Sequence, residues 1–257
     1  MKEEFSNKWG IILGGSNGLG LATARKLANH GMNLCIVHRD RKGALEPFEK
    51  EVEQFRAMGV EVKTFNKDAI KQETLEEVLN EIPKQSIHLL LHSIAKGSVK
   101  PLLSKTDSLT TEDYQITIQA MGLSWLSWTQ FAIQNDLFNP KARNIAFTSE
   151  GNSKAIPNYG AVSAAKATLE ALMRQMAAEY APLGLRTNCV QAGVTETQSF
   201  QRIPGSDRIA AFAKQRNPFH QLTQPEDVAN AVYLLCREEA DWINGTVLTV
   251  DGGESLR

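Results

Sequence analysis

Short apolar runs alternate with longer amphipathic segments along almost the whole chain. Apolar runs of strand length lie at 9–13, 33–37, 60–65, 87–92, 144–148, 185–190 and 246–250. The segments between them repeat apolar residues with the period of an α-helix, which predicts helices over 19–29, 45–58, 74–81, 110–134, 159–180 and 223–236. This alternation predicts right-handed βαβ units and a doubly wound parallel sheet with helices on both faces.

Two strand segments and two helix starts carry the clearest local signals. The runs Ile11-Ile12-Leu13 and Leu89-Leu90-Leu91 are typical of parallel strands that are buried on both faces. The segments Thr110-Thr111-Glu112-Asp113 and Thr223-Gln224-Pro225-Glu226 have the residue types and spacing of helix N-caps. We therefore expect residues 1–257 to form one Rossmann-type α/β domain. Residues 194–221 interrupt the alternation and are interpreted as an irregular lid over a substrate site.

Composition narrows the class of protein. The 257 residues, of which 42% are hydrophobic and 22% charged, suit one large globular α/β domain. A formal net charge of -1 provides no overall field for nucleic acid or a membrane surface. The charged residues 1–5 and the lack of an apolar run of roughly 20 residues predict a cytoplasmic protein. The three cysteines are expected to be buried thiols, and the histidines show no metal-ligand spacing.

A glycine-rich turn, Gly14-Gly15-Ser16-Asn17-Gly18-Leu19-Gly20, follows the first strand and opens the first helix. Gly14, Gly18 and Gly20 permit a tight turn that a pyrophosphate can approach closely, and the helix N-terminus then presents free N–H groups to the anion. An ordinary glycine-rich turn is the alternative. Its place on the first βα unit of a regular α/β chain favours dinucleotide binding, with contacts from Ser16, Asn17 and Leu19.

The end of the second strand discriminates between the two nicotinamide cofactors. NAD enzymes usually place an acid there, whereas NADP enzymes place an arginine near the 2′-phosphate. Here His38 stands at the position of the acid and is followed by Arg39, Asp40 and Arg41. Because two arginines can grip a phosphate through paired hydrogen bonds, the sequence predicts NADPH. NADH is the alternative if Asp40 serves the ribose.

At this point the chain resembles the short-chain dehydrogenase/reductase family over nearly its whole length. The match covers the glycine turn, Asp68, Tyr159 with Lys166, the segment 192–197 and the ending Asp251-Gly252-Gly253. Leu13 departs from the family's usual threonine, and Ser93-Ile94-Ala95 stands in a run that is Asn-Asn-Ala-Gly in many members. The resemblance implies cofactor contacts by Asp68, Ala69, Ser93, Ile94, Ala95, Lys166, Ala192, Gly193, Val194, Thr195 and Thr197.

More narrowly, the chain resembles the bacterial enoyl-acyl-carrier-protein reductases, in particular their NADPH-preferring subgroup. The run His92-Ser93-Ile94, the run Ala155-Ile156-Pro157-Asn158-Tyr159 and the spacing of Tyr159 and Lys166 carry this resemblance. It implies reduction of enoyl thioesters in fatty acid synthesis, an acyl-carrier-protein or CoA thioester as the substrate partner, and a homotetramer.

The spacing of Tyr159 and Lys166 has a direct chemical meaning. Most members of the family separate the pair by three residues, whereas six residues, 160–165, intervene here. Both spacings keep the two side chains on one helix face, but the rise grows from about 6 Å to about 10 Å. With Lys166 at the nicotinamide ribose, Tyr159 lies about one turn further away. This suits the enolate oxygen of a conjugated thioester better than a ketone oxygen.

Several assignments stay open at this stage. Ser149 replaces a second tyrosine of many enoyl reductases, and either Ser149 or Thr148 donates a hydrogen bond to the thioester or serves only as a structural hydroxyl. Gln119 stands where many members carry a relay asparagine, and a surface role is the alternative. Ser163 occupies the tyrosine position of carbonyl reductases. Four apolar side chains either line an acyl groove or pack the lid: Phe200, Ile203, Ile209 and Phe212.

Two other functions compete with enoyl reduction. The first is a 3-oxoacyl or carbonyl reductase, or an alcohol dehydrogenase, of the same family. The second is a catalytically silent dinucleotide-binding regulator. Retention of both Tyr159 and Lys166 argues against the silent regulator.

Overall fold

Seven parallel strands form one sheet in the order β3-β2-β1-β4-β5-β6-β7. The computed structural model describes residues 4–257, so the first three residues of the charged N-terminus lie outside it. The strands are β1 (Trp9–Leu13), β2 (Asn33–His38), β3 (Val62–Asn66), β4 (Ile87–His92), β5 (Phe138–Thr148), β6 (Arg186–Ala192) and β7 (Val247–Val250). The Rossmann-type single domain expected from the alternation is confirmed.

The strand order places a crevice at the glycine turn. The chain runs from β1 outward to β2 and β3, then returns to the other side of β1 with β4. Leu13 at the end of β1 pairs with Val37 of β2 and with His92 of β4. In such sheets, ligands bind beyond the carboxyl ends of the strands where the order reverses. The glycine turn after β1 therefore lies at the carboxyl end of the sheet, at the point where ligands usually bind in this topology.

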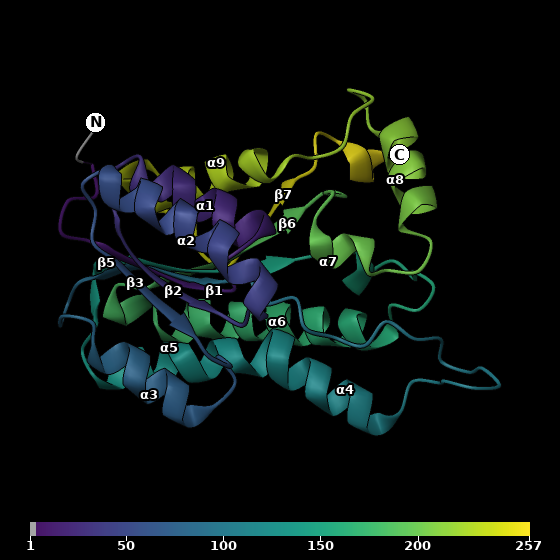
Figure 1. Ribbon diagram of the computed structural model, residues 1–257, viewed down its shortest axis with the longest axis horizontal. Helices are drawn as coiled ribbons and strands as arrows, with labels where there is room; N and C mark the ends of the chain where they lie inside the picture. Colours follow the sequence, from purple (N-terminus) through teal and green to yellow (C-terminus); the bar gives the residue numbers. More distant parts are fainter. Residues whose placement is uncertain (1–3) are drawn as a thin grey trace.

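Helices cover both faces of the sheet (Figure 1). On one face lie α1 (Gly18–Ala28), α2 (Lys42–Ala57) and α9 (Pro225–Cys236). On the other lie α3 (Gln72–Asn80), α4 (Thr111–Ile118), α5 (Ser124–Gln134) and α6 (Gly160–Glu179). A hydrophobic core lies on each face of the sheet. Ile12 packs in the core under α1, α2 and α9, whereas Ile11 and Leu13 pack in the core under α3, α5 and α6. The expectation of strands buried on both faces is confirmed, because alternate residues of β1 feed opposite cores.

The helix expected over 110–134 is interrupted by a π-turn, η1 (Gln119–Leu123). The backbone N–H of Ser124 bonds Gln119 O, five residues earlier, and the Ser124 hydroxyl donates to the bypassed Ala120 carbonyl at 2.9 Å. His92 Nε2 lies 2.9 Å from the same hydroxyl. Gln119 is exposed on this turn, so its side chain does not face the interior where a relay would run.

The stretch 194–221 is not irregular as expected, because it contains α7 (Gln198–Gln201) and α8 (Ser206–Arg216). Figure 1 shows both helices at the end of the molecule where the C-terminus lies. Gly205 precedes α8 with a φ of 79° and separates the two helices. The N-cap of α9 also lies one residue later than expected, since Asp227 accepts from the Gln224 N–H at 2.9 Å. No helix within residues 4–257 is long and apolar enough to cross a membrane.

Candidate active site

The glycine turn has the geometry of a pyrophosphate cradle. Gly14 has a φ of 87°, and a Cβ there would lie 2.6 Å from the Ser93 carbonyl oxygen. A Cβ on Gly20 would collide with the Gly14 carbonyl, so both positions require glycine. The Asn17 side chain makes no capping hydrogen bond to α1, which leaves amide groups at the helix start available to an anion. This backbone fits a dinucleotide phosphate.

Two other segments expected to hold the cofactor reach the same edge of the sheet. The Ser93 N–H donates to Leu13 O at 2.8 Å, which fixes the start of the run Ser93-Ile94-Ala95 beside the turn. A Cβ on Gly18 would lie 3.2 Å from Thr197 Cγ2, so the segment after β6 folds over the turn. The structure thus brings together residues 14–20, 93–95 and 192–197, as the resemblance implies.

Asp68, expected at the adenine, lies in a cluster with two cations. Its carboxylate is 3.1 Å from Arg39 Nη1 and 3.3 Å from Lys96 Nζ, and it accepts from the Ile70 N–H at 3.2 Å. Burial opposes the charge, but the Ile70 amide and the two cations together lower the pKa of Asp68. The neighbouring Ala69 carbonyl accepts from Trp128 Nε1 at 2.8 Å, which anchors this loop to α5.

The end of β2 offers arginines rather than a free acid. His38 is buried against Phe48, and its Nδ1 lies 2.9 Å from an Asp40 carboxylate oxygen. Burial lowers the pKa of His38, although Asp40 opposes this shift. The Asp40 side chain is thereby engaged within the protein and only 12% exposed. Arg39 is well exposed beside Asp68, and Arg41 is exposed at the N-cap of α2.

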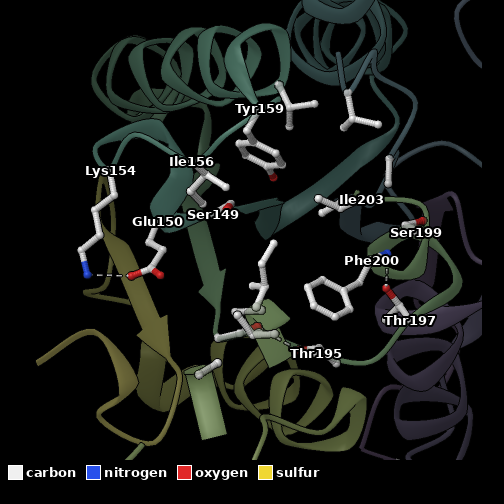
Figure 2. A pocket seen from close by; sticks show the side chains of 18 of the residues that line it. Ser149, Glu150, Lys154, Ile156, Tyr159, Thr195, Thr197, Ser199, Phe200 and Ile203 are labelled. Carbon is white, nitrogen blue, oxygen red and sulfur yellow. Dashed lines mark hydrogen bonds and ion pairs between the residues drawn. The ribbon is translucent and has the colours of Figure 1, made fainter. Parts of the chain in front are cut away.

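The sequence placed Tyr159 as the first residue of a helix over 159–180, but the structure places it at the N-cap of α6, just outside the helix. Its half-buried ring points toward a cavity near Ser149 (Figure 2). Burial raises the pKa of Tyr159, and a hydrogen bond with the Ser149 side chain partly opposes this. The ring rests on Gly151, where a Cβ would lie only 2.6 Å from Tyr159 Cε1. The structure therefore brings the expected pair Ser149 and Tyr159 together.

Lys166 lies on α6 and is only 6% exposed. Its Nζ donates to the Phe147 carbonyl at 2.7 Å, and burial lowers the pKa of Lys166 to about 8. Burial and the Lys166 charge lower the pKa of His92 to about 3, so that histidine stays neutral and packed at the strand end. Thr148, the alternative to Ser149, donates its hydroxyl to Glu170 at 2.5 Å.

A cavity of about 770 Å³ opens beside Tyr159. Its wall includes the four apolar side chains that the sequence analysis left open, two around α7 and two on α8: Phe200, Ile203, Ile209 and Phe212. Met121 of the π-turn and Val162 of α6 line the opposite part. Leu19, Ala95 and residues 192–195 also line the cavity, so the apolar space adjoins the expected nicotinamide segment.

Among the charged residues at this cavity that the sequence analysis did not find, three bond to one another: Glu150, Arg216 and Glu254. Arg216 Nη2 donates to Glu254 Oε1 at 2.6 Å and also bonds Glu150. Glu254 and Glu150 are 38 and 66 positions away from Arg216 in the chain, so no local residue spacing predicts these contacts. Gly151 was also missed, because its contact with Tyr159 depends on the three-dimensional course of the loop.

Comparisons with known proteins agree with this geometry. A family model described as enoyl-(acyl carrier protein) reductase matches residues 14–255. The NADH enoyl-[acyl-carrier-protein] reductase of Enterococcus faecalis is 25% identical, with 97% of this chain and 98% of the relative covered. A 2-(S)-hydroxypropyl-CoM dehydrogenase of Xanthobacter autotrophicus is 28% identical, with 98% of each chain covered.

Solved structures agree at the level of the fold. The crystal structure of an NADH enoyl-[acyl-carrier-protein] reductase from Aquifex aeolicus aligns with a TM-score of 0.83 at 23% identity, covering 98% of each chain. The family model spans nearly the whole chain and includes the glycine turn, Tyr159 and Lys166. The chain therefore belongs to the enoyl-(acyl carrier protein) reductase family of the short-chain dehydrogenases/reductases, which are NAD(P)-dependent oxidoreductases.

Proposed function

We propose that the protein reduces the trans-2 double bond of enoyl thioesters, carried by an acyl-carrier protein or CoA, with NADPH, as a step of fatty acid synthesis. The placement of Tyr159 carries this proposal. Tyr159 stands before the first turn of α6, whereas Lys166 lies within that helix and donates to the Phe147 carbonyl of β5. The proton donor is therefore set back from the position of the nicotinamide ribose, by about one helical turn relative to the short spacing.

That displacement matches where charge develops. A bound nicotinamide supplies the hydride, which is accepted at the β-carbon of the enoyl group. The electrons of the double bond then move to the thioester oxygen, two carbons away. Tyr159 meets that oxygen with its hydroxyl, and Ser149 supports the phenol from the loop side. The proton of Tyr159 passes to the enolate and ends on the α-carbon, which gives the saturated thioester, and a proton from solvent restores the phenol.

The ionisation of the two residues suits these roles. Burial raises the pKa of Tyr159, which keeps its hydroxyl protonated and able to donate at neutral pH. Lys166, with a pKa of about 8, is still mostly protonated at neutral pH. Its ammonium can orient the ribose and adds positive potential where the enolate forms.

The cavity supports an acyl substrate rather than a small polar ketone. Its 770 Å³ lies within the usual size range of ligand pockets, and its apolar wall can bury a hydrocarbon chain. We propose residues 194–221, with α7 and α8, as the lid of this acyl site. Phe212 on α8 is 62% exposed and would be covered by a bound chain.

The choice of NADPH rests on the end of β2. The only acid there, Asp40, is engaged by His38, which leaves Arg39 and Arg41 to meet a 2′-phosphate. NADH, the cofactor of the E. faecalis relative by its name, is the competing cofactor.

A crotonyl thioester assay with NADPH and NADH side by side tests the proposal. Turnover of crotonyl-CoA or a crotonyl carrier protein, faster with NADPH, is expected. A 3-oxoacyl thioester and a secondary alcohol run in parallel address the competing activities, including the alcohol chemistry named for the X. autotrophicus relative. Brisk ketone reduction without enoyl reduction would reject the proposal. Binding of NADPH with no turnover of any substrate would favour the silent regulator.

We also propose a homotetramer. Trp242 is 97% exposed and Ile243 beside it is 39% exposed, and a neighbouring subunit would cover these two apolar side chains. Light scattering should give a mass near four chains of 28.4 kDa. A monomeric mass at micromolar concentration would reject the tetramer.

A further inference from the structure

Three charged side chains form a cluster at the wall of the cavity, which we name the carboxylate clasp: Glu150, Arg216 and Glu254. Arg216 Nη2 is shared between the two carboxylates, at 2.6 Å from Glu254 Oε1 and in contact with Glu150. Glu254 is 2% exposed, and Arg216 and Glu150 are 12% and 19% exposed. Such a group is expensive to bury, so its presence beside a reactive tyrosine calls for an explanation other than stability.

The clasp joins three parts of the chain that are far apart in the sequence. Arg216 is the last residue of α8, and Glu254 begins the C-terminal turn η5 (Glu254–Leu256). The other oxygen of Glu254 accepts from the Val194 N–H at 3.0 Å, in the expected nicotinamide segment. Glu150 begins η2 (Glu150–Asn152), directly after Ser149. Movement of the Arg216 guanidinium would therefore displace both the turn η2 and the segment that contains Val194.

The route from the clasp to the reacting hydroxyl is short. Glu150 is bonded to Arg216 on one side and to Lys154 at 2.9 Å on the other, which fixes the turn η2 (Figure 2). The next residue, Gly151, is the surface on which the Tyr159 ring rests, with no room for a Cβ. Displacing η2 by even a fraction of an ångström moves the floor under the ring. Because Tyr159 lies outside α6, the helix alone does not hold it.

We infer that Arg216 is a positioning residue for the acid Tyr159, acting through Glu150 and the Gly151 floor. Arg216 bonds to Glu150 and Glu254, and its guanidinium lies over the Phe212 ring. Arg216 links α8 and the C-terminal turn η5 to the turn η2, so that a shift of either element would move the turn beneath Tyr159. This inference rests on the proposed role of Tyr159, so one of its tests does not depend on turnover.

Fluorine NMR gives that independent readout. The chain has four tyrosines, so a sample labelled with 3-fluorotyrosine gives four signals, and Tyr159→Phe identifies the one from Tyr159. In Arg216→Met and in the nearly isosteric Glu150→Gln, we expect the Tyr159 signal to shift or broaden while the other three stay. Arg25→Met, which breaks the Arg25–Glu51 pair between α1 and α2, is the matched control and should leave the Tyr159 signal in place.

Kinetics of a glycine pair supply the second test. Gly151→Ala needs no unusual backbone but pushes a methyl group into the Tyr159 ring, whereas Gly43→Ala on α2 meets nothing within 4 Å. We expect Gly151→Ala to lower kcat for the enoyl thioester by roughly 10- to 100-fold, because small misplacements of a reacting group cost this much. The Kd for NADPH should stay within about twofold in both variants, since neither glycine belongs to the cofactor turn.

The clasp variants complete the kinetic test. Arg216→Met should lower kcat in the same direction, and Arg216→Lys should restore part of it, because a lysine can neutralise but not bridge two carboxylates with a planar fork. An unmoved Tyr159 signal in Arg216→Met and Glu150→Gln overturns the inference, even if turnover falls. A moved signal in a protein that reduces no enoyl thioester leaves the clasp standing and removes only the proposed function. If Arg216→Met does not fold, Glu150→Gln decides the result.

Discussion

In the proposed reaction Tyr159, from a loop, and Lys166, from a helix, divide the chemistry, and the ionisation of each residue suits its proposed task. Tyr159 keeps its proton because burial raises its pKa, and Lys166 keeps its charge although burial brings its pKa to about 8. Removing the Tyr159 hydroxyl should therefore remove stabilisation of the transition state without disturbing the cofactor turn.

Tyr159→Phe is expected to lower kcat for crotonyl thioester by about 100-fold or more, in the range typical of a lost proton donor. The Kd for NADPH, measured by fluorescence titration, should change little. Tyr180→Phe, at the far end of α6, serves as the control. Equal turnover in Tyr159→Phe would remove this residue from the reaction.

Arg39 is the residue on which cofactor preference should depend. Its guanidinium is 65% exposed and lies 3.1 Å from Asp68, the residue expected at the adenine. Loss of a charge-assisted contact to the 2′-phosphate should weaken NADPH by roughly 10- to 100-fold in Arg39→Gln and leave NADH nearly unchanged. Arg174→Gln, on the exposed face of α6, is the control. Parallel losses for both cofactors would show that Arg39 does not read the phosphate.

At the scale of elements, α9 depends on a buried cation at its C-terminal end. Arg143 on β5 is 1% exposed and donates to Leu235 O at 2.5 Å and to Arg237 O at 2.8 Å. It also pairs with Asp241 at 2.6 Å. The Arg143 guanidinium thus donates to two carbonyls at the C-terminal end of α9, where a positive charge is most favourable; the Arg237 carbonyl also accepts from the Ala240 N–H at 3.2 Å.

Arg143→Met should lower the free energy of unfolding by about 3 to 5 kcal/mol, because Asp241 and the carbonyls lose a buried partner. Urea denaturation of the purified protein measures this. The surface pair Arg25–Glu51 is the comparison, and Arg25→Met should cost no more than about 1 kcal/mol. Similar losses in the two variants would contradict the assigned role of Arg143.

The elements that could be predicted from the sequence are those specified by neighbouring residues. The strand Ile87–His92 is predicted by its local run of apolar residues, and the turn after β1 is predicted by the placement of its glycines. The π-turn could not be predicted, because it depends on the Ser124 hydroxyl replacing a backbone donor inside a buried contact with His92. Helices α7 and α8 were missed because α7 is a single turn and Gly205 breaks the periodicity between them.

The same limit explains which parts of the site were found. Ser149, Tyr159 and Lys166 belong to one short segment with a family spacing, whereas Arg216 and Glu254 reach Glu150 only after the chain has closed on itself. Contacts between distant positions leave no trace in local patterning.

At the scale of the whole molecule, two buried histidines should make the fold sensitive to acid. Burial lowers the pKa of His88 to about 4 and that of His92 to about 3, and both stay neutral in the native state. In the unfolded chain a histidine titrates near 6.5, at about the usual value. The unfolded state therefore binds more protons below that pH. Stability is fully present above about 6.5 and is lost as the pH falls toward the native pKa values.

Between pH 7 and pH 5 this linkage amounts to roughly 2 kcal/mol for each histidine. Urea unfolding at both pH values measures the drop. His88→Gln, which can keep the donor to the Cys236 carbonyl, should reduce it by about one histidine's share. His220→Gln, on an exposed loop, should leave the drop unchanged. An unaltered drop in His88→Gln would show that His88 is not responsible.

The position of Tyr159 outside α6 has one further consequence. In the proposed reaction the acid belongs to the loop 149–159 and the ribose contact to the helix, so the two can vary independently. Exchanging that loop for one of another length would move the proton donor while the nucleotide stays where it is. In this architecture the type of reaction is a property of a transplantable surface segment, and the cofactor scaffold beneath it is common to many chemistries.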